Sequence, residues 1–433
     1  FGRVALYLNK WENHKWGNLG FADLFYTTNY YFGLDYNHSN IEKRHEPFTS
    51  FPSHPFRLSR ALFDRLNNEG YDIVYVDFSQ GTGFIENNAM VLVEVIKRIQ
   101  QRLNACNSCE EISVLGASMG GLVSRYALLY MEQNKIPHKV RLFISADSPQ
   151  EGANLSIGVQ YLIDNLIKEK GLPKSTHQEL RELNEKVIQS PAVKEMVLSH
   201  IAGYTQETDF RHNFKRQMME MGNYPNQARL VSLSNGSFIG NKLNFNEGDI
   251  IGEVNISFLD FYNILKIRVT KLLQNPALLI PFNIHKAMAD GFANYTWDNL
   301  PVRLVSQIDR GAKGMEKYFS YRNLNIDNAP GGYSTYNKAI EAGIPIIATC
   351  LIPESCLIPV KSAIGISNFG GNMAVNLSTQ INKIDCDPRM TPFHSIFSPN
   401  VNEHHMAITM DNINWVLSQL DANEYELGPN IPE

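Results

Sequence analysis

The stretch "ISVLGASMGGLVSRYAL", residues 112–128, decides the fold. It begins with apolar β-formers and ends with apolar residues at helical spacing, and between them Gly116, Ser118 and Gly120 form a G-x-S-x-G pattern. Glycines are favoured where a Cβ would collide with the chain in a sharp turn between strand and helix. We therefore predict that this turn presents the Ser118 hydroxyl as a nucleophile. The alternative is an ordinary glycine-rich turn.

Strand and helix patterns alternate through the first 150 residues around this stretch. Buried strands are predicted at residues 3–8, 71–78, 111–117 and 139–147, and covering helices at 55–70 and 87–104. Such alternation is typical of an α/β fold, in which crossover helices flank a mostly parallel central sheet.

Two later stretches depart from this alternation. The periodicity of residues 152–227 is helical, whereas in residues 250–340 the period does not decide between strand and helix for segments such as 255–269. We predict one domain over residues 1–433, with a helical lid insertion at 152–227 and a second insertion at 250–340.

Composition excludes several classes of function. A chain of 433 residues with 43% hydrophobic residues can bury a large core. The formal net charge is −5 and no window gathers Lys and Arg, so nucleic acid is not an expected partner. The longest greasy stretch, residues 277–282, is too short to span a bilayer, and no transmembrane segment is expected.

Five cysteines bear on the compartment. Cys106 and Cys109, and Cys350 and Cys356, lie close enough in sequence for local disulfides, which would suit an exported protein. The alternative is reduced thiols in a cytosolic enzyme. No second Cys or His pair has ligand spacing, so no metal site is predicted. The sequence opens without a signal-peptide pattern, and export would require a leader that has been removed.

The serine motif and a second segment carry a family resemblance. Residues 114–128, "VLGASMGGLVSRYAL", and 144–156, "ISADSPQEGANLS", resemble the α/β-hydrolase superfamily, in particular its lipase and serine-esterase branch with GPI-inositol-deacylase-like proteins. Residues 71–90 and 391–409 are similar to a group of exported Bacteroidota hydrolases. The resemblance implies a secreted, periplasmic or cell-surface location. Gln150 and "LNKWEN" at 8–13 depart from the family patterns.

A serine nucleophile requires a base, and superfamily order places the acid and then the histidine after the serine. His404 and His405 lie in the polar loop "NVNEHHMAIT", residues 400–409, before the last predicted helix. The resemblance to an "NExH" pattern favours His405 as the base, with His404 as the alternative and His394 as a more distant one.

The acid orients the imidazole and should follow a late strand. Asp249 in "NFNEGDII", residues 244–251, has this order and lies in a segment that the resemblance covers. Asp147, Asp385 and Asp387 are the alternative acids, and each carboxylate can also serve merely as a cap or turn residue.

The oxyanion hole requires two backbone N–H donors. One is the Met119 N–H, which lies at a helix N-terminus where partial positive charge stabilises an anion. The second is expected in the loop after the strand at residues 3–8, where Asn9 and Lys10 are the candidates. Trp11 and Trp16 in the same loop either line a substrate pocket or simply pack.

Together these observations predict a serine hydrolase that cleaves carboxylic esters through an acyl-enzyme on Ser118, without a cofactor. Its expected substrate is a small-molecule or lipid-like ester, because a large lid insertion suits an acyl group. An amidase, peptidase or thioesterase with the same triad is the alternative enzyme. A non-catalytic binding protein on a hydrolase scaffold is the alternative outside enzymes. The sequence leaves the oligomeric state open.

Overall fold

The computed structural model describes residues 3–8, 65–66, 71–76, 78, 80–105, 107–168, 178, 181–182, 184–203, 207–244, 250–256, 308–309, 316–322, 326–334, 354–366, 391–405 and 407–422. Its strands are β1 (Arg3–Leu8), β2 (Asp72–Val76), β3 (Ile112–Ala117), β4 (Val140–Ala146), β5 (Arg229–Leu233), β6 (Ile250–Ile256), β7 (Ile308–Asp309), β8 (Glu316–Arg322), β9 (Gly331–Ser334), β10 (Ser355–Pro359) and β11 (Ser395–Phe397). Its α-helices are α3 (Ile85–Ala105), α4 (Met119–Gln133), α5 (Ile157–Lys168), α7 (Pro191–Met196), α8 (Asp209–Glu220), α12 (Val360–Ala363) and α14 (Met410–Asp421).

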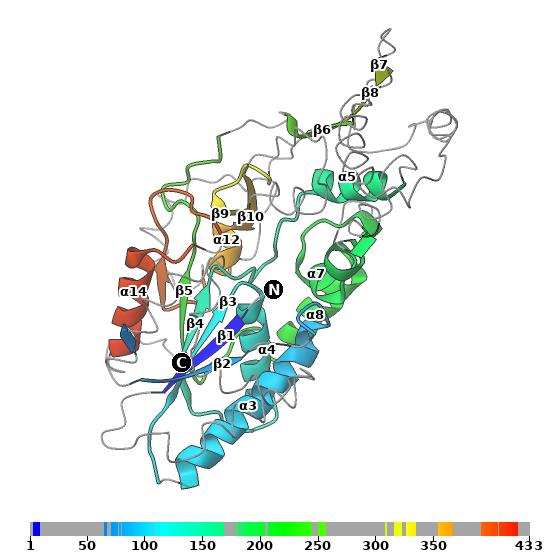
Figure 1. Ribbon diagram of the computed structural model, residues 1–433. Coiled ribbons are helices and arrows are strands. Elements are labelled where there is room, and N and C mark those ends of the chain that lie inside the picture. Colours follow the sequence, from blue (N-terminus) through cyan, green and yellow to red (C-terminus); the bar gives the residue numbers. More distant parts are fainter. Residues whose placement is uncertain are drawn as a thin grey trace, which may run out of the picture.

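The main sheet has six strands in the order β11-β5-β4-β3-β1-β2. Strands β3, β4, β5 and β11 are parallel, so their carboxyl ends meet at one edge of the sheet. Helices cover this sheet on both sides, and the predicted α/β class is confirmed (Figure 1).

Strand β1 runs against its neighbours. It pairs antiparallel with both β2 and β3, and its register places Arg3 opposite Ala117 and Leu8 opposite Ile112. The strand at residues 3–8 is therefore confirmed, and it is an antiparallel member of the mostly parallel sheet. An apolar run reads the same in either direction, so periodicity fixes the existence of a buried strand and not its orientation.

The two faces of the sheet bury separate cores. Val114 of β3 and Phe143 of β4 belong to the core that α3 and α4 cover, while Leu142 and Ile144 pack with the apolar side of α14. Side chains alternate between the faces of a strand, and a parallel sheet covered on both faces buries both sets. This explains the nearly continuous apolar runs of β3 and β4.

Helix α3 confirms the helix predicted at residues 87–104. Ile85, Ala89, Leu92, Ile96 and Ile99 are all buried, and their spacing of three and four residues places them on one side of the helix. The helix predicted at 55–70 lies almost wholly outside the described residues, which include only a helical fragment at 65–66.

The described elements between residues 152 and 227 are helical, with α5, α7 and α8 joined by a π-helical turn at Asn184–Ile188 and a 3₁₀ turn at Ile201–Gly203. Between 250 and 340, β6, β8 and β7 form an antiparallel sheet, and β9 pairs with β10. That these stretches are insertions, and that the first is a lid, stays a prediction.

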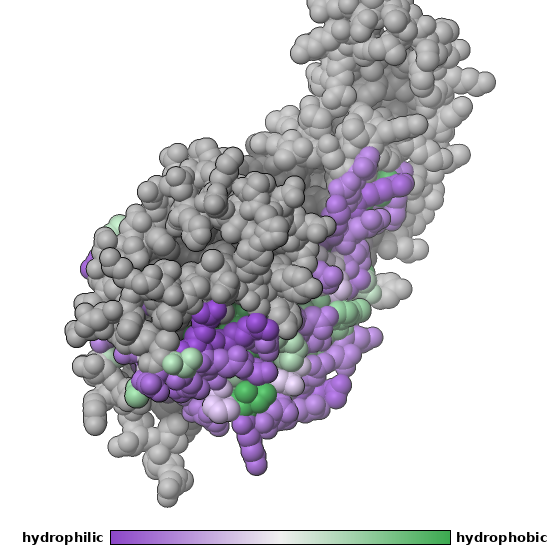
Figure 2. Space-filling model, turned by 60° about the horizontal axis from the view of Figure 1, so that its bottom comes forward, coloured by the Kyte–Doolittle hydropathy of each residue, from purple (hydrophilic) through white to green (hydrophobic). Residues whose placement is uncertain are grey.

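Two observations concern the helices and the surface of the described residues. None of its helices has both the length and the apolar character needed to cross a membrane. On the face shown in Figure 2 its surface is mainly hydrophilic, with hydrophobic residues only in small separate spots. A large exposed apolar patch, which often marks a docking site, is therefore not seen among the described residues of this face.

The cysteines in the described part are reduced. Cys109 is exposed, Cys356 is buried, and both are free thiols. Cys106 and Cys350, the partners considered for them, lie outside the described residues, so the prediction of export rests on the resemblance.

Candidate active site

Ser118 occupies a strained turn between β3 and α4. Its backbone has φ 53° and ψ −129°, an uncommon conformation for a residue with a Cβ. The turn is tight because a Cβ at Gly116 would lie 2.4 Å from the Gly120 carbonyl oxygen, and one at Gly121 would lie 2.3 Å from Ser148 Oγ. The predicted reason for the glycines is confirmed at Gly116. The turn leaves the Ser118 side chain half-buried at the carboxyl edge of the sheet.

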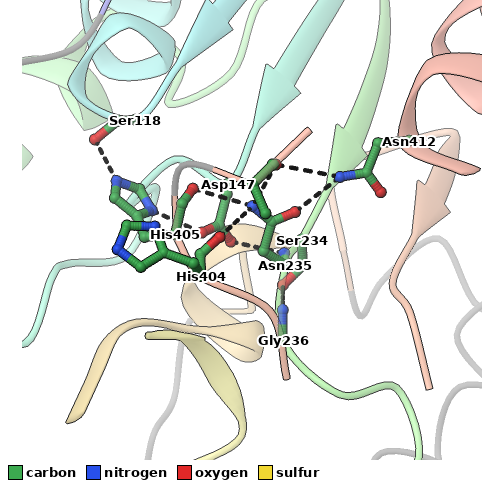
Figure 3. Close-up of polar contacts among 9 residues, drawn as sticks. Ser118, Asp147, Ser234, Asn235, Gly236, His404, His405 and Asn412 are labelled. Atoms are coloured by element: carbon green, nitrogen blue, oxygen red, sulfur yellow. Dashed lines mark hydrogen bonds and ion pairs between the residues drawn. The ribbon is translucent and has the colours of Figure 1, made fainter. Parts of the chain in front are cut away.

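His405 is the histidine that the structure brings to Ser118. Its Nε2 lies 2.8 Å from Ser118 Oγ, and its other ring nitrogen, Nδ1, lies 2.7 Å from Asp147 Oδ2 (Figure 3). A carboxylate can only accept, so Nδ1 carries the proton and Nε2 is free to accept the serine proton. The ring is 8% exposed, which shields this relay from bulk water.

His404, the alternative base, has a different environment. Its ring meets the ring of Tyr333 edge to face, with centroids 5.7 Å apart. His394 lies elsewhere: its Nδ1 accepts a hydrogen bond from the Leu230 N–H at 3.0 Å, and burial lowers its pKa.

Asp147 takes the place that the sequence analysis assigned to Asp249. It follows β4, has φ 40°, is 2% exposed, and its Oδ1 accepts the Asn235 N–H at 2.9 Å. Of the predicted acids, Asp147 is the one that the described residues bring to His405. The physical reason is strand order: β4 lies directly beside β3, so a side chain at its carboxyl end reaches the same edge as Ser118. Asp249, Asp385 and Asp387 lie outside the described residues.

Gly332 of β9 makes room for this acid. A Cβ at Gly332 would lie 2.0 Å from Asp147 Oδ2, the oxygen that faces the histidine. Cys356 of β10 is also close, since burial and the charges of Asp147 and Asp327 raise its pKa well above its usual range. A segment predicted to be an insertion thus packs directly against the acid.

Of the predicted oxyanion donors, Met119 lies within the described residues. Met119 begins α4, where the first N–H groups have no partner within the helix, so its N–H can donate to an anion beside Ser118. Asn9, Lys10, Trp11 and Trp16 lie outside the described residues. Leu8, which precedes them, pairs with Ile112 at the start of β3. The second donor therefore stays a prediction.

Gln150 and Arg125 form buried hydrogen bonds that hold the loop after Asp147. Gln150 Nε2 donates to Ser145 Oγ at 2.9 Å and to Ser148 Oγ at 3.1 Å, while its Oε1 accepts from Arg125 Nη1 at 3.2 Å. Arg125 is 1% exposed, lies 3.5 Å from the centroid of the Tyr224 ring, and has a pKa lowered by burial. Gln150, which departs from the family pattern, is thus a structural residue here.

The sequence analysis missed Arg125 and Asn235. An arginine within the apolar helix pattern of "LVSRYALL" was the available signal for Arg125, because buried guanidinium groups require several acceptors. Nothing in the sequence distinguishes Asn235 from the other asparagines of the loops. Within the part of the chain described, no three His, Cys, Asp or Glu side chains gather where they could hold a metal ion.

The fold and this Ser–His–Asp arrangement define the class of protein: an α/β protein with four parallel strands flanked by helices, consistent with the α/β-hydrolase fold. Residues 50–227 match the family model described as "PGAP1-like alpha/beta domain", a GPI inositol-deacylase-like α/β-hydrolase domain. This match covers Ser118 and Asp147 but not His405, and it indicates a hydrolase.

Neither the search of curated proteins nor that of solved structures found a match. The comparisons therefore give no support to the finer resemblance to exported Bacteroidota hydrolases.

Proposed function

We propose that this chain is a serine hydrolase that cleaves carboxylic esters through an acyl-enzyme on Ser118. The single observation that carries the proposal is the continuous chain of contacts from Ser118 Oγ through both ring nitrogens of His405 to Asp147, with distances of 2.8 Å and 2.7 Å. Such a chain gives an otherwise weak hydroxyl nucleophile its base and orients that base.

The residues divide the reaction into two steps. Ser118 Oγ bonds to the ester carbonyl carbon while its proton passes to His405 Nε2, and the Met119 N–H stabilises the negative oxygen. The bond to the alcohol then breaks, and the alcohol leaves with the proton from His405. Water repeats the sequence on the acyl-enzyme: His405 takes a proton from the water and returns it to Ser118 as the acid is released.

The proposal is tested with a fluorophosphonate probe, which reacts with an activated serine. We expect stoichiometric labelling of the full chain and its complete loss in Ser118→Ala. Ser124→Ala is the matched control, because Ser124 Oγ is buried and donates to the Gly120 carbonyl at 2.8 Å. Absence of labelling in the wild-type protein would leave a binding protein on a hydrolase scaffold as the better interpretation.

The acyl part of the substrate is tested separately. If residues 152–227 form a lid over an acyl group, turnover of p-nitrophenyl esters depends on chain length from acetate to palmitate. Equal turnover along this series would count against a lid that binds acyl chains. Matched p-nitroanilides and thioesters measure the preference for the leaving group.

A further inference from the structure

Asn235 lies two residues beyond the end of β5 and is 2% exposed. Its side-chain Nδ2 lies 3.1 Å from the carbonyl oxygen of His404, 3.0 Å from that of His405 and 3.0 Å from that of Ala407 (Figure 3). An amide NH₂ has two hydrogens, so three carbonyls share them. The side chain therefore binds the backbone of the loop that carries His405, within residues 400–409 and here called the His405 loop, on both sides of the histidine.

A fourth contact fixes the orientation of this amide. Asn412 in the first turn of α14 donates its Nδ2 to Asn235 Oδ1 at 3.1 Å. With its oxygen occupied by this donor, the amide of Asn235 directs its NH₂ toward the three carbonyls. Asn412 of α14 thus orients the Asn235 side chain, which in turn binds the His405 loop.

The backbone of Asn235 connects the same loop to the acid. Its N–H donates to Asp147 Oδ1 at 2.9 Å, and its carbonyl accepts the Glu403 N–H at 2.7 Å. One residue therefore contacts Asp147 with its main chain and the His405 loop with both its main chain and its side chain. Asn235 therefore binds both partners of the 2.7 Å contact between His405 Nδ1 and Asp147 Oδ2.

We propose that Asn235 is a positioning residue, whose neutral amide holds the His405 loop at hydrogen-bond distance from Asp147 and Ser118; this inference rests on the proposed function. A carboxylate cannot replace it, although it has nearly the same shape, because it offers no N–H and would face three carbonyl oxygens. It would also add a second negative charge beside Asp147.

The experiment compares Asn235→Asp and Asn235→Ala with the wild-type full chain. Both variants keep the main-chain contacts to Asp147 and Glu403, so they isolate the amide. We expect kcat for a p-nitrophenyl ester and the rate of fluorophosphonate labelling to fall about 10- to 100-fold, with KM within about twofold, because misplacement of a catalytic group by about 1 Å has effects of this order.

The labelling rate per folded molecule separates positioning from a purely structural role, because a loss of stability alone lowers only the folded fraction. The pH profile reports the charge that the Asp variant adds near His405. In Asn235→Asp the added negative charge favours the protonated imidazole, so the acid limb of kcat/KM moves to higher pH. Asn235→Ala adds no charge, and its acid limb stays in place. Loss of stability alone would move neither limb.

Asn88→Asp is the matched control. Asn88 is 5% exposed on α3, and its Nδ2 donates to the Gln80 carbonyl at 3.2 Å, so the same exchange buries a similar defect away from the His405 loop. We expect it to lower the melting temperature and to leave kcat per folded molecule unchanged. Equal labelling rates in the wild type and both Asn235 variants would overturn the inference.

A second variant keeps the test decisive if the Asn235 variants do not fold. Asn412→Ala removes the donor that orients the amide together with a longer contact to the Ala407 carbonyl at 3.4 Å, and we expect the labelling rate to fall about three- to tenfold, since the hydrogen bond to Asn235 is lost. An unchanged rate would contradict the inference. If the wild type is labelled and the variants are labelled equally fast, the role of Asn235 is refuted and the proposed function stands. If the wild type is not labelled, the proposed function is refuted as well.

Discussion

Two buried carboxyl groups, Asp147 and Glu195, are each 2% exposed but have opposite surroundings. Asp147 faces donors: the Asn235 N–H meets one oxygen and His405 Nδ1 the other. Glu195 of α7 faces the Ile85 N–H at 2.8 Å on one side and the carboxyl group of Glu86 on the other. Burial, which dominates, and the neighbouring Glu86 raise the pKa of Glu195 to about 9.

The difference shows that the donors around a buried carboxyl group, rather than its burial, decide what the group can do. Asp147, supplied with two donors, can orient an imidazole and stabilise its charged form. Glu195 holds its proton at neutral pH and links α7 to the first turn of α3 as a neutral donor and acceptor. Arg211 does not reverse this, because its Nη1 donates to the Glu195 backbone carbonyl at 3.3 Å.

Asp147→Asn should produce the largest effect, because the amide removes the charge that stabilises the imidazolium and disturbs the tautomer of His405. We expect kcat for a p-nitrophenyl ester to fall by about 10³- to 10⁴-fold with KM nearly unchanged, as for the corresponding change in other serine triads. Loss of turnover in Asp249→Asn with retention in Asp147→Asn would instead restore the original sequence prediction.

Gly332→Ala tests whether Asp147 depends on the space that β9 leaves for it. The new methyl group would lie 2.0 Å from Asp147 Oδ2 and displace the carboxylate from His405. We expect kcat to fall about 10- to 100-fold, in line with a shift of about 1 Å in a catalytic group.

Gly222→Ala is the control for Gly332→Ala. Its Cβ would meet no atom within 4 Å, but Gly222 has φ 103°, so the substitution strains the backbone. We expect a loss of stability of about 1–3 kcal/mol and an unchanged kcat per folded molecule. If Gly332→Ala behaves in the same way, the carboxylate tolerates displacement and the comparison with Glu195 weakens.

The sequence singled out Ser118 and His405, which the structure brings together, because local chemistry and chain order point to both. Gly116 is required by backbone atoms of Gly120 and Gly121, which lie within three residues of Ser118, and the histidine is constrained by its order after the last strand. The acid was harder, since Asp147 and Asp249 both follow strands and both precede His405 in sequence. Only the neighbourhood of β4 and β3, which is a property of the assembled sheet, separates them.

The direction of β1 and the contacts of Asn235 were beyond sequence reasoning for related reasons. Strand direction leaves no mark on an apolar run such as "RVALYL", so the antiparallel pairing of β1 with β3 could not be predicted. Asn235 acts on residues 404, 405 and 407, and such distant partners of an amide are not encoded in its local sequence.

Glu195→Gln gives the smallest expected effect and tests the other side of the comparison. The folded pKa of about 9 lies above the ordinary value of 4.5, so between these values the unfolded chain releases a proton that the folded chain keeps. The stability of the wild type therefore falls as pH rises through this window, by up to about 1 kcal/mol per pH unit. Glutamine does not ionise, so the variant should gain stability relative to the wild type as pH increases.

Urea unfolding at pH 5.5, 6.5 and 7.5 measures this slope. The control is Glu182→Gln. Glu182 is exposed and hydrogen bonds from Lys186 and Gln178 lower its pKa, so it is ionised in the folded and the unfolded chain throughout this pH range. The free energy of unfolding of this variant should therefore fall with pH as steeply as that of the wild type. Parallel stability curves for Glu195→Gln and the wild type would mean that Glu195 is already ionised in the folded protein. In that case Glu195 would be a charged carboxylate beside Glu86 that requires hydrogen-bond donors, as Asp147 does. The contrast between Asp147 and Glu195 would then disappear.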